Sequence, residues 1–140
     1  MYQYMAEIVR VVDGDTVDVL IDLGFGIRMK ERVRLYGVDT PEIRSLALRE
    51  KKFGLLAKEY VEGILTVGSL VILDTKLDTT GKYGTVLGVF TPVAGGPTLN
   101  NLILTHRLGV AYYGQSKSDI RALHEENWDF LEANQAAGVL

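Results

Sequence analysis

Three consecutive segments at the start of the chain alternate apolar and polar side chains, which is the period of a half-buried β-strand. They cover residues 4–12, 16–23 and 27–36, and they are joined by Asp13-Gly14 and by Gly24-Phe25-Gly26. Such short connections join antiparallel neighbours, because parallel strands need a long crossover. The segments therefore predict a three-stranded meander.

The pattern becomes helical after the meander. Residues 43–65 carry apolar side chains three and four positions apart, and residues 99–107 predict a second, shorter helix. A last helix follows Ser116 or Ser118, and we expect it to pack on the barrel through Leu123, Trp128 and Leu131. Further strands are predicted at 70–73 and 85–91. This order predicts one α+β domain over residues 1–140, a five-stranded OB-fold barrel with about three α-helices.

Composition excludes several kinds of site. The chain has no cysteine, so disulfides and cysteine zinc sites are excluded. His106 and His124 are too far apart in sequence to suggest a histidine metal cluster, and we expect them to be surface or packing residues. A net charge of −3 and a pI near 5.4 argue against coating nucleic acid through bulk charge.

The sequence also carries no pattern for membrane insertion or export. No apolar run approaches the roughly 20 residues that span a bilayer. The first residues lack a charged segment followed by an apolar one, so no signal peptide is visible. We therefore expect a cytoplasmic monomer without a membrane partner.

Acidic residues flank the predicted meander at one of its ends. Asp13 and Asp15 lie in its first turn, and Asp39 and Glu42 follow its third strand, which carries Arg34. The first turn of a meander lies at the same end as the exit of its third strand, so Asp15 and Asp39 can converge near Arg34. Hard oxygen ligands of this kind favour Ca²⁺ or Mg²⁺ over Zn²⁺.

Each of these motifs also has a purely structural interpretation. Asp13-Gly14 is a common hairpin turn, although that turn does not require the second carboxylate that follows it. Thr40-Pro41-Glu42 is typical of a helix start, with Thr as N-cap, Pro at the first helical position and Glu in the first turn. Both interpretations remain open from the residues alone.

Taken together, the motifs resemble the staphylococcal nuclease (thermonuclease) family. The matching pieces are VVDGDT at 11–16, RVRLYGVDTPE at 32–42, the helix that follows, and KYG at 82–84. The resemblance runs from about residue 8 to residue 113. Either acidic motif alone would be weak, but both at this spacing, with an Arg five residues before the Asp, form a specific pattern.

The resemblance implies a calcium site. Asp15 and Asp39 would be the ligating carboxylates, and the backbone carbonyl of Thr40 would be a third ligand. Asp13 would lie in the outer shell of the ion. The implied cofactor is Ca²⁺.

The resemblance also implies roles in phosphodiester hydrolysis. Glu42 would position or deprotonate the attacking water, and Arg34 would bind the phosphate in its transition state. Elementary chemistry agrees, because a cation and a guanidinium stabilise charge that develops on phosphate oxygens. Three residues would hold the terminal phosphate and the base: Lys82, Tyr83 and Tyr112.

One position departs from the family pattern. The family has a second catalytic Arg directly after KYG, and here that residue is the neutral Thr85. Arginines that stabilise phosphoryl-transfer charge can be worth about 10³–10⁵ in rate. Arg44 or Arg49, early in the predicted helix, could substitute for the missing charge.

Two functions remain open, and a structural domain without a site is a third interpretation. The first is a calcium-dependent nuclease that hydrolyses DNA or RNA, expected to be single-stranded, with a rate weakened by Thr85. The second is an impaired nucleic-acid-binding module that retains the metal and phosphate sites. The enzyme is favoured because a binding module has no use for a water-activating carboxylate, and because the whole set of implied site residues is intact: Asp15, Arg34, Asp39 and Glu42.

Overall fold

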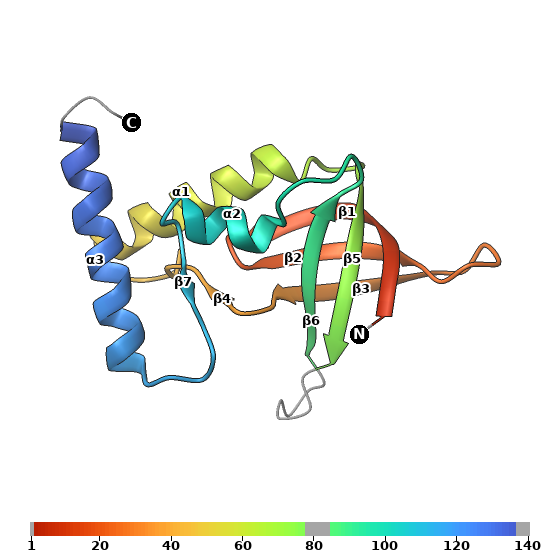
Figure 1. Ribbon diagram of the computed structural model, residues 1–140, viewed down its shortest axis with the longest axis horizontal. Coiled ribbons are helices and arrows are strands. Elements are labelled where there is room, and N and C mark those ends of the chain that lie inside the picture. Colours follow the sequence, from red (N-terminus) through yellow and green to blue (C-terminus); the bar gives the residue numbers. More distant parts are fainter. Residues whose placement is uncertain (1, 78–84, 137–140) are drawn as a thin grey trace.

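Five strands close into a barrel (Figure 1). The computed structural model describes residues 2–77 and 85–136, and its barrel strands neighbour one another in the order β1-β2-β3-β6-β5. Their bounds are β1 (Tyr2–Asp13), β2 (Thr16–Asp22), β3 (Arg28–Leu35), β5 (Leu70–Leu77) and β6 (Val86–Pro92). The predicted meander and five-stranded barrel are confirmed.

The barrel has one parallel seam, between β3 and β6. Its three residue pairs are Val33–Val86, Arg34–Leu87 and Leu35–Gly88. All other neighbouring strands of the barrel are antiparallel. Arg34 therefore belongs to the short seam that joins the meander to β6.

Side chains that point alternately inward and outward along the strands fill the barrel interior, and a bulge in β1 changes this alternation. Ala6 and Ile8 of β1 are buried in alternation, but Val11 and Val12 are buried side by side. The pairing of β1 with β2 shifts between Ile8 and Arg10, and again before Asp13. Each extra residue of a bulge turns the side chains that follow it to the other face of the strand.

Within the described residues, three helices and a short two-stranded ribbon complete the fold. The helices are α1 (Leu48–Ile64), α2 (Leu99–Thr105) and α3 (Lys117–Ala136), and the ribbon pairs β4 (Val38–Asp39) with β7 (Val110–Ala111). Figure 1 shows α3 on the far side of β4 and β7 from the barrel. No helix within the described ranges is long and apolar enough to cross a bilayer.

The helices share one apolar core with the barrel. Trp128 of α3 is buried and stacks on Phe53 of α1, with ring centroids 5.6 Å apart. Leu131 is also buried, so the predicted packing of α3 through these two residues is confirmed. The expected burial of Leu123 is wrong, because 39% of this residue is exposed.

The first helix begins later than predicted. Residues 41–47 form turns, and α1 starts at Leu48 after Ala47, which makes no side-chain cap. Thr40 is not an N-cap. It is buried, and its backbone N–H donates to the carboxylate of Asp15 at 3.2 Å. Thr40 thus makes a tertiary contact with Asp15, and the helix begins eight residues after it.

Two other expectations also need correction. The strand predicted at 70–73 continues to Leu77, because β5 pairs with β6 from Val71 to Leu77. Tyr36, which we expect from the sequence to be a core aromatic residue, is instead 39% exposed and lies beneath the ammonium group of Lys76. Ser116 is confirmed as the cap of α3, since its hydroxyl accepts from the N–H of Asp119 at 3.2 Å.

Candidate active site

A groove of about 710 Å³ lies between the end of the barrel and the first turns of α3. Figure 1 shows the elements that border it, with β4 and β7 between the barrel and α3. The residues that line it come from both sides: Arg34, Asp39, Thr40, Pro41, Glu42, Glu50, Tyr112, Gln115, Lys117, Ser118, Ile120, Arg121 and His124. It thus gathers most of the candidate residues that the structure describes.

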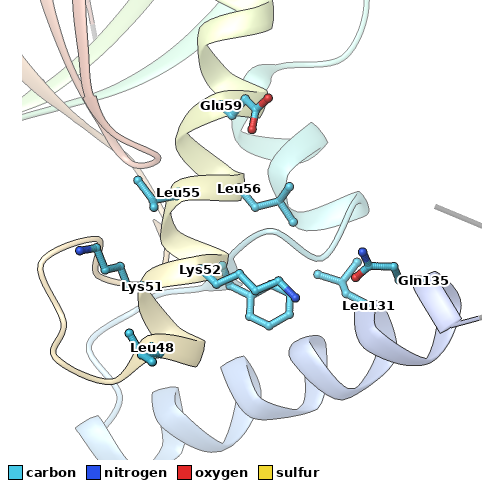
Figure 2. A pocket seen from close by; sticks show the side chains of 9 residues that line it. Leu48, Lys51, Lys52, Leu55, Leu56, Glu59, Leu131 and Gln135 are labelled. Atoms are coloured by element: carbon cyan, nitrogen blue, oxygen red, sulfur yellow. The ribbon is translucent and has the colours of Figure 1, made fainter.

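A second groove, of about 630 Å³, lies between α1 and α3 and has a different chemistry. Its labelled side chains in Figure 2 include Leu48, Leu55, Leu56 and Leu131. Glu59 is the one carboxylate among its described lining residues. Without a second carboxylate or an arginine beside it, this groove is not the candidate active site.

The turn after β1 is held tightly against the residues that follow β4. A Cβ on Gly14 would lie 2.9 Å from Cβ of Ala57 and 3.0 Å from Oγ1 of Thr40. Gly14 has no positive φ angle. Glycine is therefore needed here for close approach rather than for the turn itself, and that approach brings Asp15 next to Thr40.

Asp15 is a buried carboxylate within a network of donors. One oxygen accepts from the hydroxyl of Thr16 at 3.0 Å, and the other accepts from the N–H of Thr40 at 3.2 Å and lies 3.9 Å from Nη2 of Arg34. Burial raises the pKa of Asp15 above its usual range, although Arg34 and both hydrogen bonds act in the opposite direction. The ionised form thus carries a desolvation cost that a bound cation would offset.

Arg34 connects the two acidic motifs. It lies near the end of β3, and the chain then reverses at Gly37, whose φ of +73° suits glycine. The reversal returns Asp39 toward β3, so that Nη2 of Arg34 lies 3.1 Å from Oδ1 of Asp39. The same guanidinium lies 5.5 Å from the ring centroid of Tyr112. The structure thus brings together Arg34, Asp15, Asp39 and Tyr112.

His124 of α3 is a site residue that the sequence analysis missed. It is buried, and its Nε2 lies 2.8 Å from Oδ2 of Asp39. Because an ionised carboxylate only accepts, Nε2–H is the donor. Both oxygens of Asp39 therefore have partners, Arg34 from the barrel and His124 from α3. In sequence, His124 and Asp39 are 85 residues apart, and no local motif links them.

Glu42 lies at the exposed rim of the groove, and its carboxylate accepts no hydrogen bond from the described residues. Its loop is held by α1, because a Cβ on Gly54 would lie 2.7 Å from the carbonyl oxygen of Pro41. Desolvation raises the pKa of Glu42, and so do the negative charges of Asp15 and Asp13. A raised pKa suits a carboxylate that must take up a proton.

The donor chemistry of the site fits a calcium ion. Asp15 and Asp39 face the same guanidinium, and the charge of each raises the pKa of a neighbouring carboxylate. A divalent cation relieves this kind of repulsion, and Ca²⁺ accepts carboxylate and carbonyl oxygens. Among the described residues, no three His, Cys, Asp or Glu side chains are already grouped as a metal cluster. The fit thus depends on the predicted carbonyl of Thr40 and on water for further ligands.

The other predicted residues lie elsewhere. Asp13 is the half-buried last residue of β1, while Lys82 and Tyr83 fall outside the described residues. Thr85 directly precedes β6 and is not among the described residues that line the groove.

Neither proposed substitute for the missing arginine lines the groove. Arg49 is bound by Glu132 at 2.9 Å and Asp129 at 2.6 Å, and it lies over the ring of Trp128. Arg44 lies in the exposed turns before α1. The suggestion that Arg44 or Arg49 compensates for Thr85 therefore finds no support in the geometry.

Comparison with known proteins gives one family and two relatives. A family model described as "Staphylococcal nuclease homologue" matches residues 32–137, a range that includes Arg34, Asp39 and Glu42 and begins after Asp15. "Protein ParB" of Escherichia coli is 38% identical over 82 residues, which cover 59% of this chain and 38% of that protein. "Micrococcal nuclease" of Shigella flexneri is 30% identical over 121 residues, which cover 80% of this chain and 62% of that protein. The chain thus spans less than two thirds of the length of either relative.

Proposed function

The chain belongs to the staphylococcal nuclease family, and from that premise we propose that it is a calcium-dependent nuclease acting on DNA or RNA. The observation that carries the proposal is the convergence of Arg34, Asp39 and Glu42 on one groove, with the buried carboxylate of Asp15 beside Arg34. These residues come from three separate parts of the chain. A convergence of this kind is what hydrolysis of a phosphodiester requires.

Each group has a chemical task in that reaction. Water attacks phosphorus, its proton passes to Glu42, and the bond to the leaving oxygen breaks. Arg34 donates to the phosphate oxygens, on which charge develops in the transition state. Its guanidinium has five N–H donors, and the bond to Asp39 uses one of them, so donors remain for a phosphate.

The acidic residues would serve the metal. A Ca²⁺ ion held by Asp15, Asp39 and the carbonyl of Thr40 would supply positive charge beside the phosphate, with Asp13 in its outer shell. His124 keeps Asp39 oriented through the 2.8 Å hydrogen bond. A ligand fixed by an outer hydrogen bond loses less freedom when the ion binds.

We also propose how the substrate is held. Tyr112 lines the groove beside Arg34 and offers an aromatic face to a base. Lys82 and Tyr83, which lie outside the described residues, would hold the terminal phosphate and the base together with it. Stacking of this kind needs an unpaired base, which supports a single-stranded substrate. A cytoplasmic location and a monomeric state stay predictions.

The neutral Thr85 supports a second candidate function. The chain would then be a binding module that retains the groove but hydrolyses its ligand poorly. The exposed carboxylate of Glu42 at the rim of the groove favours the enzyme over this module, because a proton acceptor is useful only for turnover. Weak cleavage with normal binding is the expected sign of the missing arginine.

The test measures cleavage and calcium binding separately. Single-stranded DNA and RNA are incubated with the protein in millimolar Ca²⁺, and then with a chelator, which should abolish cleavage. Calcium at about 100 times its Kd should stabilise the fold by about 2.7 kcal/mol.

Both the cleavage and the stabilisation by calcium should disappear in Asp15→Ala and Asp39→Ala. Glu62→Ala is the control, since Glu62 is exposed on α1 and does not line the groove. A melting temperature that stays constant over a wide calcium titration would contradict the metal site. Binding of DNA or RNA without any cleavage would favour the module.

A further inference from the structure

The groove has a second wall, formed by α3, and this wall carries two cations. Lys117 and Arg121 both line the groove, opposite the barrel residues that include Arg34. They are four residues apart on one helix, so they share a face. The barrel wall contributes Asp39 and Glu42 besides Arg34, and Glu50 of α1 also lines the groove. Lys117 and Arg121 are thus the cations that α3 places opposite these carboxylates.

The position of this wall is held by the fold. His124, three residues after Arg121, is hydrogen-bonded to Asp39. Trp128, one turn further on, is buried against Phe53. These contacts hold the first turns of α3 against the barrel end, so the two cations have a defined place beside the candidate site.

Arg121 is oriented and yet still able to bind an anion. Its Nε–H donates to Glu125 at 2.8 Å, its Nη1 donates to Glu50 at 3.4 Å, and its guanidinium lies 5.2 Å from the ring centroid of Trp128. These two hydrogen bonds use two of the five N–H donors of a guanidinium. Its side chain is half exposed, so the remaining donors can reach a ligand in the groove.

Lys117 is exposed and forms no ion pair with a described residue. An unpaired ammonium group at the edge of a groove is available to a phosphate without first losing a partner. Lys117 and Arg121 are remote in sequence from the acidic motifs, so no local pattern links them to Arg34.

We propose that Lys117 and Arg121 bind the backbone phosphate next to the scissile one, so that α3 forms a phosphate-binding wall for a single strand. This inference rests on the proposed nuclease function. Arg34 would contact the reacting phosphate, and the α3 cations would contact its neighbour. Their loss should therefore weaken binding and leave turnover nearly unchanged.

The first experiment measures affinity. A fluorescein-labelled oligothymidylate is titrated with full-length protein in Ca²⁺, on a Glu42→Gln background that prevents cleavage. Lys117→Gln and Arg121→Gln should each raise Kd about 3- to 10-fold. Each should also reduce the slope of log Kd against log salt by about 0.7, the value for one lost phosphate contact on a single strand.

Matched controls separate a local contact from bulk charge. Lys30→Gln and Arg10→Gln remove exposed cations of the barrel that do not line the groove, and they should change Kd by no more than about twofold. Arg121→Lys keeps the charge and should recover most of the affinity. Unchanged melting temperatures would show that none of these variants acts by unfolding the chain.

The second experiment follows cleavage with Glu42 intact. Lys117→Gln and Arg121→Gln should raise KM while kcat stays within about twofold. Wild-type affinity in both variants, or losses equal to those of the controls, would overturn the α3 wall and leave the proposed function standing. A loss of kcat at unchanged Kd would also overturn it, since the cations would then act on the reacting phosphate. If the wild-type protein neither binds nor cleaves the oligonucleotide, the proposed function fails, and the α3 wall fails with it.

Discussion

Replacing Trp128 with alanine removes the side chain that anchors α3 to the rest of the molecule. The indole is 2% exposed, and it stacks on Phe53 with an interplanar angle of 5°. Two guanidinium groups, those of Arg49 and Arg121, lie 5.4 Å and 5.2 Å from its ring centroid. Truncation thus opens a cavity in the core and also removes the aromatic contacts that hold these cations.

The expected cost is about 3–5 kcal/mol, the usual range for a buried Trp→Ala substitution. With an unfolding entropy of about 2.1 cal/mol/K per residue, this corresponds to a fall in Tm of about 10–17 °C. Urea denaturation followed by far-UV circular dichroism measures the free energy of unfolding directly. Fluorescence is unsuitable, because Trp128 is the only tryptophan of the chain.

Phe130→Ala is the matched control. Phe130 is two residues further along α3, 43% exposed, and lies 3.9 Å from the guanidinium carbon of Arg107. Its loss should cost about 1 kcal/mol or less. Equal effects of the two substitutions would refute the docking of α3 through Trp128, and with it the reasoning that places His124 beside Asp39.

Three further predictions concern charge and packing. Thr85→Arg should raise kcat by roughly 30- to 1,000-fold with a smaller change in KM, since a transition-state contact of ~2–4 kcal/mol acts on turnover. Steady-state kinetics on single-stranded DNA in saturating Ca²⁺ tests this. A wild-type rate equal to that of the variant would contradict it. The hydrogen bond from Arg32 lowers the pKa of Asp18 in the folded state, so its stabilisation is present above the unfolded pKa of 3.8 and is lost as pH falls through the folded value. Asp18→Asn should therefore lower the free energy of unfolding at pH 7, and urea titrations at decreasing pH should show the difference from wild type disappearing; a constant difference would count against the pair. A Cβ on Gly88 would lie 2.6 Å from the side chain of Leu73 and 2.7 Å from that of Val33, so Gly88→Ala should lower the free energy of unfolding by about 1–3 kcal/mol in urea denaturation. Gly63→Ala, with open space around its Cβ, should be neutral or stabilising. Similar values for both substitutions would contradict this packing.

The barrel, and the proximity of its two acidic segments, can be predicted from patterns that are local in the sequence. Alternation predicts the meander, and meander geometry predicts that Asp15 and Asp39 lie at the same end, near Arg34. The structure has this arrangement because adjacent strands leave little freedom in how their ends align.

What the sequence does not predict depends on contacts between distant segments. His124 is separated from Asp39 by most of the domain, and a helical pattern alone does not reveal which strand the helix will meet. The helix start expected at Thr40 is also wrong, because Thr40 is buried beside Asp15, 25 residues away in sequence, and α1 begins only at Leu48. Tyr36 follows a strand with buried neighbours, yet the turn at Gly37 leaves it exposed.

The parallel seam between β3 and β6 has a consequence for mutational screening. Arg34 shares this seam with Leu87 and Gly88, and Asn100 of α2 donates from its amide to the carbonyl of Gly88 and accepts from the N–H of Phe90. A substitution at these seam positions would displace the guanidinium without touching a substrate. In a screen scored only by activity, such positions would be mistaken for active-site residues, and a parallel measurement of protein abundance would distinguish them by their reduced amount of folded protein.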